Sequence, residues 1–128
     1  MRLLLDTHAL LWFLANDPRL SVAAESAILD PANERWLSPI SLLEIAIKVR
    51  IGKLPLHAPF AVLFPAQLTL NRIGLLPLEV KHIEPLTMLP RHHKDPFDRL
   101  IAATALVELL TLISADAIFD SYGLSRLW

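Results

Sequence analysis

The sequence predicts an α/β sandwich built around a mostly parallel sheet. Short apolar runs that are typical of buried strands alternate with longer segments of helical spacing, and turn residues separate them. The chain has 128 residues, which suits one domain of ordinary size, and its hydrophobic fraction of 54% provides for a substantial core. We therefore expect a single domain over residues 1–128, with helices on both faces of the sheet.

The first half of the chain is predicted to contain two strands and three helices. Ser21 is a favourable N-cap for the second helix, and Pro39 suits the first turn of the third. Gly52 is typical of a helix end. The third helix has one apolar face, formed by Ile40, Leu43, Ile47 and Ile51. The strands are expected at residues 2–5 and 35–38, and the helices at residues 7–15, 21–29 and 39–51.

The second half is predicted to begin with a proline-rich loop at residues 53–60. A polar, histidine-rich loop at residues 90–94 precedes Asp95 and Pro96, which together form a strong helix start. Gly123 ends a short helix or turn. Helices are expected at residues 61–71, 81–88, 95–109 and 116–122, and strands at residues 75–80, 110–114 and 124–128.

The composition excludes sites that need cysteine, and the sequence argues against a signal peptide and a membrane span. The absence of cysteine rules out disulfides, thiolate metal sites and thiol nucleophiles, and it fits a reducing cytoplasm. The net charge of −1 argues against binding nucleic acid by bulk charge, but it allows a local basic rim around an acidic site. Asp6 and His8 interrupt the first apolar run, which argues against a signal peptide. Residues 100–114 include Glu108 and make a poor membrane span. We expect a cytoplasmic protein without membrane association.

Four acidic residues are expected to meet at one edge of the sheet. Asp6 ends the first strand, Glu44 lies just over one turn into the third helix, and Asp98 lies in the first turn of the long late helix. Asp116 follows the strand at residues 110–114. Ligands of open α/β sheets bind beyond the carboxyl ends of the strands, which is where these acids lie. Close carboxylates repel one another unless they bind cations, and Mg²⁺ or Mn²⁺ prefers oxygen ligands. Such a site suits phosphate esters.

Each acid also has a simple structural explanation. Asp6 could cap the first helix, and Asp116 the turn that follows it. Glu44 could complete a capping box or pair with Lys48 four residues later. Asp98, in the first turn of its helix, would interact favourably with the helix dipole. The convergence of all four acids, rather than any one of them, favours a functional site.

Four motifs resemble those of PIN domains. Residues 3–8 (LLLDTH) resemble the opening motif, an acid at the end of the first strand followed by Thr or Ser. Residues 38–45 (SPISLLEI) resemble the second motif, residues 93–102 (HKDPFDRLIA) the third and residues 114–116 (SAD) the fourth. The chain is similar, more narrowly, to the VapC-type toxins of bacterial and archaeal toxin–antitoxin pairs, and Asp-Pro-Phe-Asp-Arg is the most specific element.

The resemblance implies a Rossmann-like three-layer sandwich and an Mg²⁺- or Mn²⁺-dependent endoribonuclease that hydrolyses RNA with water activated by the metal. It also implies a homodimer and a cognate antitoxin that inhibits by inserting a segment near the site. The residues that match the acidic positions, as catalytic residues and metal ligands, are Asp6, Glu44, Asp98 and Asp116. The hydroxyls of Thr7 and Ser114 match positions that support these ligands. Asp95 is an additional nearby acid, interpreted first as a helix cap.

A basic loop beside the predicted site is a candidate for contacting RNA phosphates. It comprises Arg91, His92, His93 and Lys94, and Arg99 could join it. A solvated loop explains the same residues equally well. No matching ligand pair supports a zinc site at the two histidines. His8 is interpreted as structural, and Lys48 as solubilising the end of its helix. Residues 54–64 could form part of a partner groove or simply pack under a long connection.

Two other kinds of protein compete with this interpretation. One is a catalytically inactive PIN-like module that binds RNA or protein, and the complete set of four acids argues against it. The other is a phosphotransfer domain of the receiver or haloacid-dehalogenase type. A receiver needs an acidic pair after its first strand, whereas this chain has Asp6 alone. The phosphatase needs Asp-x-Asp, and His8 occupies the third position here.

Overall fold

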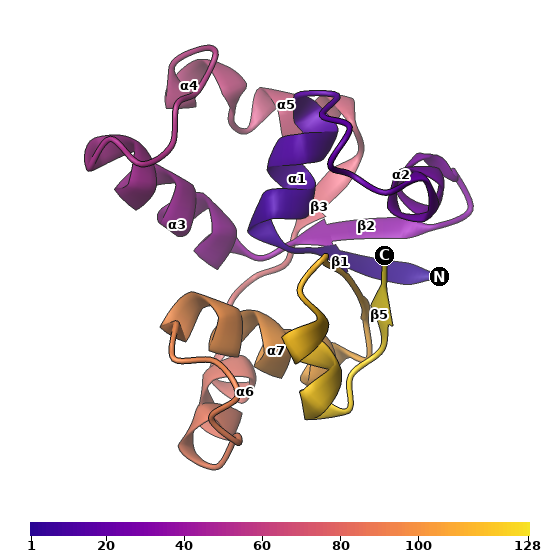
Figure 1. The fold of residues 1–128 in the computed structure, drawn as a ribbon, viewed down its shortest axis with the longest axis vertical. Coiled ribbons are helices and arrows are strands. Elements are labelled where there is room, and N and C mark those ends of the chain that lie inside the picture. The colour runs from indigo at the N-terminus through magenta and orange to yellow at the C-terminus, as the bar shows by residue number, and fades with distance from the viewer.

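The structure is a computed structural model that describes residues 1–128, and it confirms the predicted α/β sandwich (Figure 1). Its five strands pair in parallel throughout, in the order β3-β2-β1-β4-β5. The first strand is therefore central, and its three leucines are fully buried. The strands are β1 (Arg2–Leu5), β2 (Glu34–Leu37), β3 (Ile73–Leu75), β4 (Thr111–Ile113) and β5 (Arg126–Leu127).

Helices cover both faces of the sheet, as predicted. In Figure 1, α1 and α2 lie on one side and α6 and α7 on the other. The α-helices are α1 (Thr7–Leu14), α2 (Val22–Leu29), α3 (Pro39–Arg50), α4 (Phe60–Leu63), α5 (Ala66–Leu70), α6 (Val80–Ile83) and α7 (Pro96–Glu108). Two 3₁₀ helices, η1 (Glu84–Thr87) and η2 (Ala117–Tyr122), complete the structure. No helix has both the length and the apolar character needed to cross a membrane.

The alternation of side chains along β1 divides the core into two layers. Leu3 and Leu5 join the larger cluster, which includes buried residues of α1, α2 and α3. Leu4 points to the opposite face and packs with buried residues of α7 and with Phe119 of η2. The sheet is therefore the middle of three layers, and helices of both outer layers lie near the carboxyl ends of its strands.

The predicted caps are present. Asp6 accepts a hydrogen bond from Ala9 N at the start of α1, Ser21 caps α2 and Asp95 caps α7. Pro39 lies in the first turn of α3. Gly52 follows the end of α3 with a φ of +74°, a conformation that glycine adopts without a steric penalty.

Several predicted elements differ from the structure. The helix expected at residues 61–71 is two helices, because Pro65 forces Phe64 into an extended conformation between them. The strand expected at residues 75–80 is wrong, since β3 ends at Leu75 and Pro77 cannot donate to a sheet. The helix expected at residues 81–88 is α6 followed by η1, and η1 has Pro85 in its first turn. The strand expected at residues 124–128 is reduced to the two residues of β5.

Of the four residues of the predicted apolar face of α3, only Ile40 packs against a core cluster. Leu43, Ile47 and Ile51 are 49%, 41% and 57% exposed. Helix α3 instead buries Ser41, Glu44 and Ile45. The helix is therefore turned so that a carboxylate faces inward at the strand ends. We refer to Leu43, Ile47 and Ile51 as the α3 apolar face.

Candidate active site

The four predicted acids line one pocket at the carboxyl ends of the central strands. Asp6 directly follows β1, and Asp116 lies three residues beyond the end of β4. Glu44 and Asp98 come from α3 and α7, which approach this edge together. The full lining consists of Asp6, Thr7, His8, Glu44, Lys48, Asp95, Asp98, Asp116 and Phe119.

Parallel pairing of β1 with β4 brings Asp6 next to Ser114. Leu5 pairs with Ile113, and Asp6 N donates to the Ile113 carbonyl at 3.1 Å. The next side chains along both strands therefore stand side by side. The fully buried Ser114 hydroxyl bonds to the Asp6 carboxylate and also accepts from Asp116 N at 3.1 Å. Burial raises the pKa of Asp6, while the hydrogen bonds from Ser114 and Ala9 N oppose this rise.

Glu44 is held by partners on both carboxylate oxygens. Thr7 donates its hydroxyl to Oε1 at 2.6 Å, and Lys48 Nζ approaches Oε2 at 2.6 Å. Ser41 Oγ lies 3.0 Å from the Thr7 hydroxyl. The pair of Glu44 with Lys48, considered from the sequence as a simple helix pair, is therefore present. The same contact places Lys48 in the acidic pocket, which its interpretation as a solubilising residue missed, although the four-residue spacing was a visible signal.

Asp98 is half-buried among the other acids of the pocket. Burial and the neighbouring charge of Asp95 raise the pKa of Asp98 to about 6, and Glu44 and Asp116 add to the rise. Asp95 lies close because it caps the same helix, where its carboxylate accepts from Phe97 N at 2.7 Å. Carboxylates at this edge thus repel one another, as their convergence predicted.

Asp116 is held by one backbone amide and one histidine. Its Oδ1 accepts from Ile118 N at 3.0 Å, and its Oδ2 lies 2.7 Å from His93 Nε2. His93 is buried, so its ring faces the acid and not the solvent. Sequence reasoning placed His93 among residues that contact RNA, and no local signal connected it with Asp116, which is 23 residues away.

The remaining basic residues divide into exposed and internally bonded groups. Arg91, His92 and Lys94 are exposed on the loop before α7. The guanidinium of Arg99 instead donates to three backbone carbonyls, those of Leu86, Leu89 and Pro90, at 3.0–3.3 Å. His8 was interpreted as structural, but it is exposed, lines the pocket and stacks on Trp12 with ring centroids 5.5 Å apart.

The chemistry of the donors fits a hard divalent cation. The acidic groups offer carboxylate oxygens, which Mg²⁺ and Mn²⁺ prefer. Burial raises the pKa of Asp6, and burial together with the charges of neighbouring acids raises the pKa of Asp98, so both ionised carboxylates would gain from a bound cation. As the side chains stand, no three acidic or histidine groups are arranged to hold an ion. Glu44 and Asp116 are instead engaged with Lys48 and His93.

Comparison with known proteins agrees with the motifs. The model of the PIN domain family matches residues 3–124. The chain is 32% identical over 114 residues to "Ribonuclease VapC22" of Mycobacterium tuberculosis, covering 88% of this chain and 85% of that protein.

Two solved structures have a similar fold. One is VapBC2 from Rickettsia felis bound to a DNA fragment from their promoter, with a TM-score of 0.74, 18% identity, and coverage of 99% of this chain and 98% of that one. The other is a toxin–antitoxin complex from Klebsiella pneumoniae, with a TM-score of 0.65, 18% identity, and coverage of 98% and 95%.

The raised pKa of Asp98 predicts that a substitution that removes its charge stabilises the folded protein, and that this gain depends on pH. The native carboxylate has a pKa of about 6, above the unfolded value of about 4, so the free energy of unfolding falls as pH rises between these values. We expect Asp98→Asn to raise that free energy by about 1 kcal/mol at pH 7.5, a figure reduced for solvent screening, and to change it little at pH 4. Urea denaturation in EDTA measures both.

Asp120→Asn is the matched control, with the opposite sign. Hydrogen bonds from Arg126 lower the pKa of Asp120, so the ionised form stabilises the native state above about pH 4. This variant should lose stability at pH 7.5 and lose less at low pH. A destabilised Asp98→Asn protein at pH 7.5 would contradict the electrostatic account of the pocket.

Proposed function

This chain belongs to the PIN-domain family, and on that premise we propose that it is a divalent-metal-dependent endoribonuclease, the toxin of a toxin–antitoxin pair that acts in the cytoplasm. The observation that carries the proposal is that the acids of all four motifs line one pocket. The similarity to a protein named a ribonuclease supports the activity, and the similarity to a toxin–antitoxin complex supports the biological role.

In this mechanism the carboxylates that hold the metal ion are those of Asp6, Glu44, Asp98 and Asp116. When bound, Mg²⁺ or Mn²⁺ supplies a Lewis acid that polarises the phosphoryl oxygen and lowers the pKa of water. Ser114 and Thr7 fix the orientations of Asp6 and Glu44 through the hydrogen bonds described above.

Basic residues at the rim of the pocket complete the site. Arg91, His92 and Lys94 are exposed on the loop that leads into α7, where they can contact phosphates of the RNA on either side of the scissile bond. Lys48 balances the charge of Glu44 and lies within reach of the pocket. Positioning of the scissile phosphate between the acidic pocket and the basic rim supplies much of the rate enhancement.

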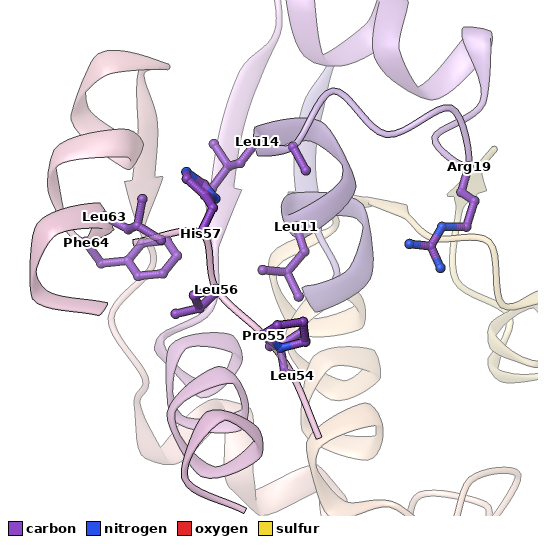
Figure 2. A pocket seen from close by; sticks show the side chains of 10 residues that line it. Leu11, Leu14, Arg19, Leu54, Pro55, Leu56, His57, Leu63 and Phe64 are labelled. Atoms are coloured by element: carbon purple, nitrogen blue, oxygen red, sulfur yellow. The ribbon is translucent and has the colours of Figure 1, made fainter. Parts of the chain in front are cut away.

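An apolar groove beside α1 is the surface that we assign to the antitoxin. Figure 2 shows Leu11 and Leu14 of α1 facing the segment Leu54–His57, with Leu63 and Phe64 beyond it. Arg19 also lines this groove, and its guanidinium lies over the ring of Trp12. Arg19 is already paired with Asp17, with Nη2 2.8 Å from Oδ2, so the groove suits an apolar segment of a partner chain.

The exposed α3 apolar face is the surface that we assign to the homodimer. Its three large aliphatic side chains point away from both core clusters. Exposed apolar patches of this kind mark protein–protein contacts, and a two-fold axis would bring the same face of a second copy against it.

The activity predicts metal-dependent cleavage of RNA that requires the charge of Asp6. Antitoxin-free protein should cut RNA with Mg²⁺ or Mn²⁺ and stop in EDTA. Asp6→Asn keeps an oxygen that can cap α1 but removes the charge, so we expect a loss of activity of about 100-fold or more with little loss of stability. The control is Asp30→Asn, at an exposed acid that does not line the pocket, and this variant should cut RNA normally. Cleavage that persists in EDTA would refute the proposal, and a metal-binding protein that cuts no RNA would favour the inactive binding module.

The groove predicts that a charge inside it weakens the antitoxin complex alone. We expect Leu14→Asp to raise the Kd for the cognate antitoxin at least about tenfold, because the groove would bury an unpaired carboxylate. RNA cleavage by the free variant should continue. Leu109→Asp, at an aliphatic side chain that is 85% exposed elsewhere, is the matched control. Calorimetry that gives equal affinities for both variants would exclude this groove as the binding surface.

The α3 apolar face predicts how the oligomer responds to mutation. Ile47→Asp should shift the protein from dimer to monomer in sedimentation equilibrium, because a self-complementary contact would place two aspartates near the two-fold axis. Val22→Asp, at a valine that is 82% exposed on α2, should leave the mass unchanged. A dimer that survives Ile47→Asp would assign the interface to another surface.

A further inference from the structure

We propose that Tyr122 and His93 are positioning residues that hold the Asp116 carboxylate in one orientation, an inference that rests on the proposed function of the pocket. The three side chains form a continuous chain of contacts. Tyr122 Oη lies 2.9 Å from His93 Nδ1, and His93 Nε2 lies 2.7 Å from Asp116 Oδ2. Neither Tyr122 nor His93 lines the acidic pocket itself.

The contacts of the chain specify which ring nitrogen of His93 carries hydrogen. A nitrogen 2.7 Å from a carboxylate oxygen must donate, because two acceptors would repel at that distance. In the neutral ring the hydrogen is therefore on Nε2, and Nδ1 is an acceptor. Tyr122 matches this need, because its oxygen accepts the His93 backbone N–H at 2.9 Å and its own hydrogen remains free to donate to Nδ1.

The ring of His93 is held rigidly in this place. It is 7% exposed and stacks on Tyr122 with an angle of 9° between the ring planes. Phe119 also packs against the ring of His93, with ring centroids 4.5 Å apart. A donor that is fixed by stacking and by a second hydrogen bond can orient an acceptor better than a mobile surface side chain can.

Asp116 needs such support more than Asp6 or Glu44 does. Its side chain is 39% exposed, whereas those other two acids are buried. Apart from His93, its carboxylate accepts only from Ile118 N among the hydrogen bonds of the structure. With both oxygens engaged, rotation of the carboxylate is restricted while lone pairs remain for a cation.

The chain also connects two parts of the pocket. His93 precedes α7, which carries Asp98, while Asp116 and Tyr122 stand at the two ends of η2. The hydrogen bonds of His93 therefore fix the start of η2 relative to the loop that leads into α7. The distance between the Asp98 and Asp116 carboxylates depends on this connection, so its loss would affect metal binding as well as the orientation of one acid.

The test compares Tyr122→Phe with wild type by two measurements on the full chain. Nitrogen-15 NMR of the neutral histidine rings should show His93 protonated on Nε2 alone in wild type and a mixture of tautomers in the variant. Titration calorimetry with Mn²⁺ should show a Kd raised about tenfold, which is the usual cost of losing a partner of a metal ligand. Thr104→Val removes another buried hydroxyl, one that bonds only within α7, and should change neither result.

Two further variants separate positioning from packing. Gln at position 93 can offer an amide N–H where Nε2 lies, so His93→Gln should retain most of the Mn²⁺ affinity, whereas His93→Leu should lose it. Unchanged tautomers in Tyr122→Phe, or equal affinities of the Gln and Leu variants, would overturn the proposal. Wild-type protein that binds no Mn²⁺ would instead refute the proposed function, and with it the metal-related role of His93, even if the NMR result confirmed the hydrogen bonds.

Discussion

The parallel pairing of β1 with β4 is the contact on which the rest of the site depends. Hydrogen bonding in register sets Leu5 beside Ile113, so the polar residues that follow both strands emerge together at one edge. Because β1 is the middle strand of the sheet, helices from both layers converge on the same edge. The site is thus built at the end of the central strand, whose backbone is hydrogen-bonded to a neighbouring strand on each side.

The pocket concentrates negative charge at a cost to the stability of the empty protein. Burial raises the pKa of Asp6, and burial with neighbouring acids raises the pKa of Asp98. Lys48, bonded to Glu44, offsets part of that charge. Such unfavourable electrostatics would not be selected for folding alone, since apolar or uncharged residues at these positions would cost less. A cation bound as proposed would relieve this repulsion.

The sequence predicted those parts of the structure that depend on local patterns. Caps, strand ends and the convergence of Asp6 with Asp116 follow from short-range rules and from the connectivity of parallel sheets. Pro65 and Pro77 were visible signals that should have broken the helix at residues 61–71 and excluded the strand at residues 75–80. The burial of His93 had no such signal, because its partners come from elements that are distant in the sequence. The rotation of α3 about its axis was equally hidden, since three of the four residues of its predicted apolar face are exposed.

Arg99 shows how a residue can be misread when only its charge is considered. Its planar fork spans three carbonyls of the segment that leads to the exposed basic loop, and a single ammonium could not reproduce that geometry. Replacement by lysine would preserve the charge and still loosen the loop. In a genetic screen such a variant would resemble one that fails to recognise nucleic acid, although the primary defect would be architectural. For this arginine, the phenotype would therefore point to nucleic-acid recognition, whereas the molecular cause would be the loss of hydrogen bonds that hold the loop.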